Sequence, residues 1–216
     1  MTEQIVVYGA AGKIEVLFDQ AEVLGAKGAV LMAHPHPLLG GDARHKVVEY
    51  LTRELVQNGW NVYRPNFRGV GATQGAHDAG VGETDDLVRV CVEITRASGD
   101  GPLVLAGFSY GAYIQTRVYQ RLLTQGIPVL AVALVSPGVG VTQSGRVYAP
   151  ELVPKDSLIV LGQCDERVSL NDMCDWAEHC GANVVVLPKA DHFYRGKLPS
   201  LSTVVIGYLE RNLLQL

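Results

Sequence analysis

The segment Gly107-Phe108-Ser109-Tyr110-Gly111 constrains this chain most, because it separates two patterns of different kinds. The apolar run from Leu103 to Ala106 predicts a buried strand, and the stretch from Ala112 to Leu123 favours a helix. A serine at such a turn takes a strained conformation that lifts its hydroxyl clear of the sheet, and the flanking glycines allow close packing. The pattern predicts Ser109 as a nucleophile; an ordinary turn with a capping serine is the alternative.

Strands alternate with helices along the chain, which predicts an α/β fold with a mostly parallel, twisted sheet and helices on both faces. The first two strands are joined by a glycine turn and predict an antiparallel hairpin. Thr84 is the expected N-cap of its helix. The expected strands are 5–8, 14–18, 29–33, 61–64, 103–106, 129–135, 158–161 and 184–187. The expected helices are 43–57, 84–94, 112–123, 170–179 and 201–214.

Length and composition exclude several classes of protein. A chain of 216 residues with 48% apolar side chains suits one domain, residues 1–216, with a sizeable core. The net charge of −4 and the lack of a strongly basic segment argue against a nucleic-acid partner. No apolar run is long enough to span a membrane, and the first residues do not resemble a signal peptide. We therefore expect a cytoplasmic protein with reduced cysteines.

A base and an acid follow two late strands. A serine hydroxyl needs a base to take its proton and an acid to orient that base. Asp165 comes just after one predicted strand and His192 just after the next. The chain order Ser109, Asp165, His192 is typical of one particular fold. Glu166 and Asp191 are rival acids, but Glu166 is one step off the strand axis and Asp191 adjoins the base itself. Asp165 is therefore favoured.

The segment from His34 to Gly41, with the sequence HPHPLLGG, follows the first parallel strand. Its two histidines suggest a metal site, but they are separated by a proline and only Asp42 lies nearby. An oxyanion loop is the better interpretation, since a backbone N–H is needed here opposite the Tyr110 amide. His36 is the favoured donor and Leu38 the alternative. We expect neither a metal nor an organic cofactor.

Residues 66–75, with the sequence NFRGVGATQG, form a third notable segment. Its glycines predict a compact loop beside the site. Arg68 can either bind a substrate carboxylate or brace the loop through hydrogen bonds to backbone carbonyls, and bracing is favoured. His45 and His179 are assigned to the surfaces of helices.

These motifs together resemble the α/β-hydrolases, and in particular a group of small bacterial hydrolases related to the dienelactone hydrolases. The shared motifs are HPHPxxGG at 34–41, NFRGVGxSxG at 66–75 and GxSxG at 107–111. Thr73 stands where serine is usual, which keeps a hydroxyl. The resemblance covers nearly the whole chain. It implies hydrolysis of an ester or a related acyl compound, without implying a particular substrate.

The prediction is therefore a serine hydrolase of the α/β-hydrolase fold that forms an acyl-enzyme on a small acyl substrate. Ser109, His192 and Asp165 form the triad, and the His36 and Tyr110 amides bind the oxyanion. Residues 136–157 are too few and too irregular for a helical lid, so no cap domain and an open, shallow pocket are expected. Alternatives are a thioesterase, a small peptidase or amidase, and a non-catalytic hydrolase-like binding protein. Both monomer and homodimer remain open.

Overall fold

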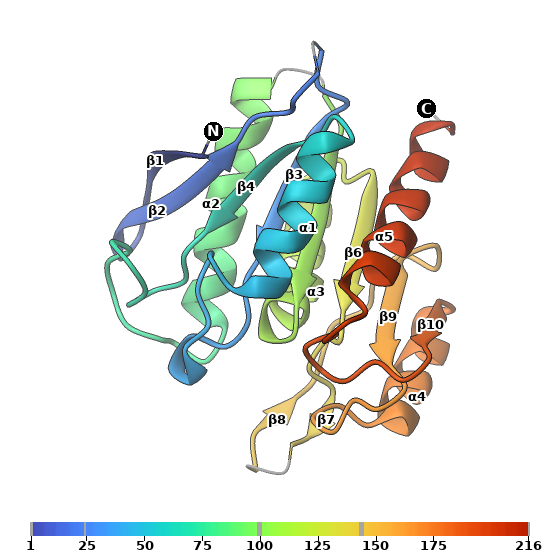
Figure 1. Ribbon diagram of the computed structural model, residues 1–216. Helices are drawn as coiled ribbons and strands as arrows, with labels where there is room; N and C mark the ends of the chain where they lie inside the picture. Colours follow the sequence, from blue (N-terminus) through green and yellow to red (C-terminus); the bar gives the residue numbers. More distant parts are fainter. Residues whose placement is uncertain (1, 24, 99–100, 143–144, 216) are drawn as a thin grey trace.

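The fold is built on one eight-stranded sheet, seen in the computed structural model of residues 2–23, 25–98, 101–142 and 145–215 (Figure 1). Its strands, in spatial order, are β1 (Thr2–Gly9), β2 (Gly12–Asp19), β4 (Asn61–Pro65), β3 (Ala29–Ala33), β5 (Leu103–Phe108), β6 (Ala131–Val135), β9 (Leu158–Gly162) and β10 (Asn183–Leu187). The β1–β2 and β2–β4 pairs are antiparallel, and the remaining pairs are parallel. The predicted hairpin and mostly parallel sheet are confirmed.

Helices cover both faces of the sheet. One face carries α1 (Lys46–Gln57) and α5 (Leu198–Leu213), which lie in front in Figure 1. The other carries α2 (Val81–Ser98), α3 (Tyr110–Thr124) and α4 (Leu170–Cys180). Alternate side chains of β3 enter the two cores, since Val30 packs in one and Leu31 in the other. The central strands are apolar throughout because both faces are buried.

The chain changes direction across the sheet between β3 and β5. After β3 it runs to β4 on one side, and after α2 it returns to β5 on the other. The two strands pair in parallel from Ala29 with Leu103 to Ala33 with Gly107, so their carboxyl ends are level. The loops that leave these ends therefore meet at one edge, which is where open α/β sheets form ligand sites.

The predicted cap of α2 is wrong. Thr84 does not cap this helix, because the helix begins at Val81 and the Thr84 hydroxyl donates to the Gly80 carbonyl (2.6 Å). The helix start is held instead by Asp78, whose carboxylate accepts the Gly82 amide (3.1 Å), and by the buried Glu83, which accepts the Gly80 amide (2.8 Å). A reciprocal arrangement of acidic side chains thus replaces the hydroxyl cap.

The segment after β6 holds a small ribbon that the sequence pattern did not indicate. Strands β7 (Gly140–Val141) and β8 (Val147–Tyr148) pair antiparallel, apart from the main sheet (Figure 1). Between β6 and β9, residues 136–142 and 145–157 form no helix, which agrees with the expectation that no cap domain follows β6. No helix in the part of the chain that the structure describes is long and apolar enough to cross a membrane.

Candidate active site

The turn after β5 places Ser109 at the carboxyl edge of the sheet. Its backbone takes a φ of 56°, and its amide donates to the Val135 carbonyl (2.8 Å). A side chain on Gly111 would meet the backbone oxygens of Ala33 and His34, the latter at 2.5 Å. Glycine is required there because α3 begins so close to the loop after β3. The strained serine conformation and the helix start behind it match the predicted strand-to-helix turn.

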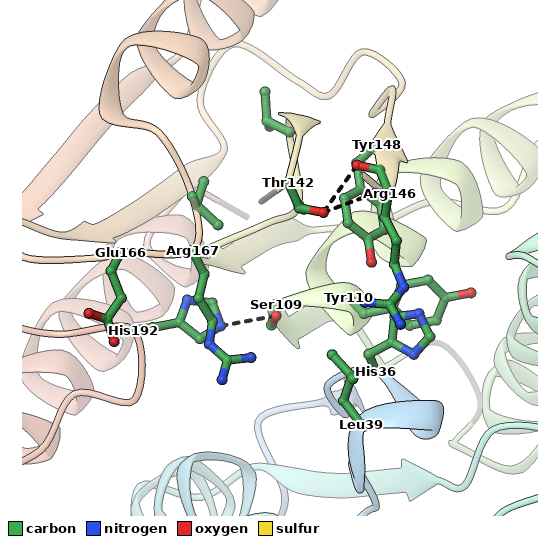
Figure 2. A pocket seen from close by; sticks show the side chains of 13 residues that line it. His36, Leu39, Ser109, Tyr110, Thr142, Arg146, Tyr148, Glu166, Arg167 and His192 are labelled. Carbon is green, nitrogen blue, oxygen red and sulfur yellow. Dashed lines mark hydrogen bonds between the residues drawn. The ribbon is translucent and has the colours of Figure 1, made fainter. Parts of the chain in front are cut away.

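His192 lies directly opposite Ser109. It follows β10, is 3% exposed, and places Nε2 3.1 Å from the Ser109 Oγ (Figure 2). This distance suits a hydrogen bond through which the ring can take the serine proton. His45, which was assigned to a helix surface, is instead half-buried and caps α1, with its ring 5.4 Å from Phe108. His179 is exposed on α4, as predicted.

Asp165 lies on the far side of the His192 ring, with Oδ2 2.9 Å from Nδ1. Its carboxylate also accepts the Arg167 amide (2.9 Å), the Val168 amide (3.1 Å) and the Ser136 hydroxyl (2.9 Å). Burial tends to raise the pKa of Asp165, but the His192 ring and these donors outweigh it, so its pKa lies below the ordinary value. The carboxyl group is therefore held ionised.

The two rival acids are engaged elsewhere. Asp191 forms an ion pair with Arg195 (3.1 Å) and also accepts the Arg195 amide (3.0 Å). Glu166 is exposed, and its side chain points away from Ser109 in Figure 2. The structure thus brings Ser109, His192 and Asp165 together in one hydrogen-bonded row.

Two residues of this site were missed by sequence reasoning. Ser136 follows β6 with a φ of 44°, and Tyr194 follows His192 with a φ of 53°. The Ser136 hydroxyl donates its proton to Asp165, so it accepts from the Tyr194 hydroxyl in their 2.8 Å contact. The Tyr194 hydroxyl also makes a longer contact of 3.3 Å with the Val160 carbonyl. Both side chains are completely buried. A serine directly after a central strand was the available signal, but serines in turns are too common to be diagnostic.

The loop after β3 approaches Ser109 from another side. The His36 ring accepts the Leu38 amide at Nδ1 (3.2 Å). The Leu38 amide, which was the alternative oxyanion donor, is therefore already hydrogen-bonded within the loop. The Tyr110 amide is the first of α3, so it lacks an acceptor inside the helix. Within residues 2–23, 25–98, 101–142 and 145–215, no hydrogen-bond acceptor is found for the amide of His36 or Tyr110. Both amides are therefore available to a ligand.

His34 anchors that loop and stays neutral. Its Nε2 accepts the Phe67 amide (2.9 Å), and its Nδ1–H donates to the Pro35 carbonyl (2.7 Å). Burial lowers the pKa of His34 to about 4. Because both ring nitrogens hydrogen-bond to the protein, His34 is not arranged as a metal ligand. The described part of the chain contains no cluster of three or more His, Cys, Asp or Glu that could hold a metal ion.

Arg68 braces the neighbouring loop, although its partner differs from the expected backbone carbonyls. Its Nε lies 2.7 Å from the Asp86 carboxylate on α2, and its Nη2 lies 3.1 Å from the same group. Thr73 keeps the role of a hydroxyl, since its Oγ1 donates to the Asn66 carbonyl (2.9 Å) and accepts the Glu15 amide (3.0 Å). The glycine-rich loop is thereby tied to both α2 and β2.

A cavity of about 430 Å³ opens above Ser109 (Figure 2). The β7–β8 ribbon forms one wall and contributes Arg146 and Tyr148. Leu39 and Val168 add apolar surface, and Arg167 lines the cavity on the His192 side of Ser109. The site therefore combines a serine hydroxyl in contact with a histidine, two amides without an acceptor in the described residues, and a small cavity.

Comparison with known proteins gives a consistent result. The family model described as "alpha/beta hydrolase fold" matches residues 30–155. A solved alpha-beta serine hydrolase homologue from Coxiella burnetii is 32% identical, with 97% of this chain and 98% of that chain covered and a TM-score of 0.82. A serine hydrolase without lid from Xanthomonas campestris is 28% identical over 97% and 94% of the two chains, also with a TM-score of 0.82. An uncharacterized Rickettsia prowazekii protein is 32% identical over 95% of this chain and 88% of its own length.

Proposed function

Since the chain belongs to the alpha/beta hydrolase fold family, we propose that it is a serine esterase that cleaves small carboxylic esters through an acyl-enzyme on Ser109. One observation carries the proposal: the Ser109 Oγ lies 3.1 Å from His192 Nε2, and the Asp165 Oδ2 lies 2.9 Å from Nδ1 of the same ring. Nucleophile, base and orienting acid are thus already in hydrogen-bonding order.

In the first half of the reaction, the Ser109 Oγ forms a bond to the ester carbonyl carbon while its proton passes to His192 Nε2. Ionised Asp165 stabilises the imidazolium that results. The His36 and Tyr110 amides bind the oxyanion, aided by the start of α3. When the tetrahedral intermediate collapses, the bond to the alcohol oxygen breaks and His192 gives that oxygen its proton.

Hydrolysis of the acyl-enzyme repeats these steps with water. His192 takes a proton from water, the hydroxide oxygen bonds to the acyl carbon, and the Ser109 oxygen leaves with the proton that His192 returns. The products are a carboxylic acid and regenerated Ser109. Every proton in the cycle moves through His192, and none requires a metal or a cofactor.

The cavity supports a small substrate. Its volume of about 430 Å³ lies near the lower end of ordinary ligand pockets. The β7–β8 ribbon is too short to form a cover like that of enzymes for long-chain esters. We expect short esters such as acetate and butyrate to be preferred to long-chain esters. One domain over residues 1–216, a cytoplasmic location and a monomeric or dimeric state stay predictions.

The proposal is tested by labelling with a fluorophosphonate and by turnover of p-nitrophenyl acetate, butyrate and palmitate. We expect one adduct at Ser109, and a kcat for the short esters that falls roughly 10⁵-fold in Ser109→Ala. Ser136→Ala is the matched control, because Ser136 has similar backbone but a buried hydroxyl; it should still be labelled. Equal labelling of Ser109→Ala, or no adduct at all, would favour a non-catalytic binding protein. Thioester and amide analogues tested in parallel identify the bond that is cleaved.

A further inference from the structure

Two arginines line the cavity above Ser109, although the chain as a whole carries a net charge of −4. Figure 2 shows Arg167 on the His192 side of Ser109, and Arg146 on the side of His36 and Tyr110. They come from different loops: Arg167 follows β9, and Arg146 directly precedes β8. The lining of the cavity thus contains more arginines than carboxylates, whereas the whole chain has a negative net charge.

Arg167 is held in place at both its backbone and its side chain. Its amide donates to the carboxylate of Asp165 (2.9 Å), the acid behind His192. Its guanidinium carbon lies 4.9 Å from the centre of the Phe193 ring, which supports its flat face. No ion pair joins it to a carboxylate in the described part of the chain. Stacking leaves the N–H edge of the guanidinium able to receive an anion.

Arg146 is positioned by the ribbon on the opposite wall. Its amide donates to the Thr142 hydroxyl (3.1 Å), and its carbonyl accepts the Thr142 amide (2.8 Å). Its side chain is half-buried and close enough to His36 for its charge to add to the effect of burial and of His77, which together lower the pKa of His36 to about 4. Its positive charge therefore faces the same cavity as the oxyanion loop.

Glu166 is the acidic side chain that lines this cavity. It is exposed, and in Figure 2 its carboxylate lies on the side of His192 that faces away from Ser109. The guanidinium of Arg167, by contrast, reaches toward Ser109 in the same view. Among the side chains that line the cavity, the two arginines therefore lie closer to Ser109 in this view than Glu166 does, while the ionised Asp165 is covered by the His192 ring.

We propose that this site selects esters whose acyl or alcohol part carries a carboxylate, which Arg146 and Arg167 bind while Ser109 attacks the ester carbonyl. The proposal rests on the proposed esterase function and adds a substrate class to it. Planar guanidinium groups bind carboxylates through paired, charge-assisted hydrogen bonds. A cavity of about 430 Å³ has room for a short dicarboxylic monoester.

Turnover is compared for two matched pairs of esters at low ionic strength. Mono-p-nitrophenyl glutarate against p-nitrophenyl valerate places the charge on the acyl part, and 4-carboxyphenyl acetate against phenyl acetate places it on the alcohol part. After correction for spontaneous hydrolysis, kcat/KM for the charged ester should be about ten times kcat/KM for the neutral ester in at least one pair. This ratio should fall about tenfold in the Arg146→Gln, Arg167→Gln double variant.

Arg195→Gln is the matched control. Arg195 stacks on the same Phe193 ring at 5.4 Å, but it pairs with Asp191 and does not line the cavity. Its loss should leave the charged-to-neutral ratio unchanged. A ratio near one for both pairs in the native protein, or a ratio that the double variant does not change, overturns the proposal.

A binding measurement separates this proposal from the esterase function. Glutarate and glutaramide are titrated into Ser109→Ala by calorimetry, so that no turnover is needed. We expect glutarate to bind at least about tenfold more tightly than glutaramide, and the preference to disappear when both arginines are also replaced. Equal binding of the two compounds contradicts the anion site. Glutarate binding without turnover or labelling of the native protein retains the anion site and rejects the esterase.

Discussion

Ser109 and Ser136 occupy nearly the same backbone position on neighbouring strands. Each follows a central parallel strand, β5 or β6, and each has a positive φ, 56° and 44°. Each amide donates to a carbonyl of the next strand over: Ser109 to Val135 (2.8 Å) and Ser136 to Val160 (2.8 Å). A serine with a strained backbone at a strand end is therefore not sufficient for the role of nucleophile that is proposed for Ser109.

The two serines differ in the residues that come after them and in the groups that their hydroxyls contact. Gly111 allows α3 to begin directly behind Ser109, whose hydroxyl faces His192 and the cavity. Pro137 and Gly138 come after Ser136, no helix starts there, and its buried hydroxyl contacts Asp165 and Tyr194. The helix start and the contact with His192 therefore support the proposed role of Ser109 as nucleophile, whereas Ser136 hydrogen-bonds to Asp165.

The largest effect is expected from filling the space behind Ser109. A side chain at Gly111 would collide with backbone oxygens of the loop after β3, which cannot move aside as a flexible side chain can. Gly111→Ala should therefore lower the free energy of unfolding by more than about 3 kcal/mol. The measurement is urea unfolding followed by circular dichroism.

Gly207→Ala is the control for this substitution. Gly207 lies inside α5 with no atom near its would-be side chain, so alanine should stabilise by about 0.5–1 kcal/mol. If Gly111→Ala were as stable as the native protein, close approach of α3 would not be what distinguishes Ser109 from Ser136.

The loop that faces Ser109 should make stability depend on pH. Folded His34 has a pKa of about 4, whereas an unfolded histidine takes up a proton near pH 6.5. Between these values the unfolded chain binds more protons, so stability is present above pH 6.5 and falls by up to about 3 kcal/mol as the pH drops to 4. Unfolding free energies measured across this range should show the loss.

His34→Gln should make this decrease with falling pH smaller, even if the variant is less stable at every pH. His179→Gln removes an exposed histidine of α4 and should leave the slope unchanged. Equal slopes for the native protein and His34→Gln would show that the loop after β3 does not depend on a neutral imidazole.

The smallest effect is expected at the second serine. Ser136→Ala removes one donor from buried Asp165, which should lower kcat about tenfold with little change in KM, since one such hydrogen bond is worth about 1–1.5 kcal/mol. The pKa of Asp165 should also rise, because Ser136 is one of the donors that lower it, and the acid limb of the kcat profile should move to higher pH.

Two further variants sharpen this last prediction. Tyr194→Phe should lower kcat less than Ser136→Ala does, because Tyr194 reaches Asp165 only through Ser136. Ser202→Ala, which removes a buried serine of α5 that donates to the Pro199 carbonyl, should leave kcat and its pH profile unchanged. An unshifted acid limb in Ser136→Ala would assign Ser136 to packing alone.

Most of the fold could be predicted because strand and helix periods are local properties. The run Ala29–Ala33 was predicted with its observed bounds, since a strand buried on both faces is apolar throughout. The start of α2 was not predicted correctly. It depends on hydrogen bonds from the Gly80 and Gly82 amides to the side chains of Glu83 and Asp78, and the spacing of apolar residues does not reveal such bonds. The β7–β8 ribbon was also missed, since two residues per strand are too few to show alternation.

The α/β architecture, the strand-to-helix turn that holds Ser109, and the chain order of Ser109, Asp165 and His192 can all be inferred from the residues alone, because each depends on residue types at short spacing. The folded arrangement was needed to show that Asp165 rather than its neighbour Glu166 contacts His192, that Ser136 donates to Asp165, and that Arg167 lines the cavity. Those contacts form between strand ends far apart in the chain. Their geometry depends on how the sheet twists and how each loop leaves it, which no local pattern records.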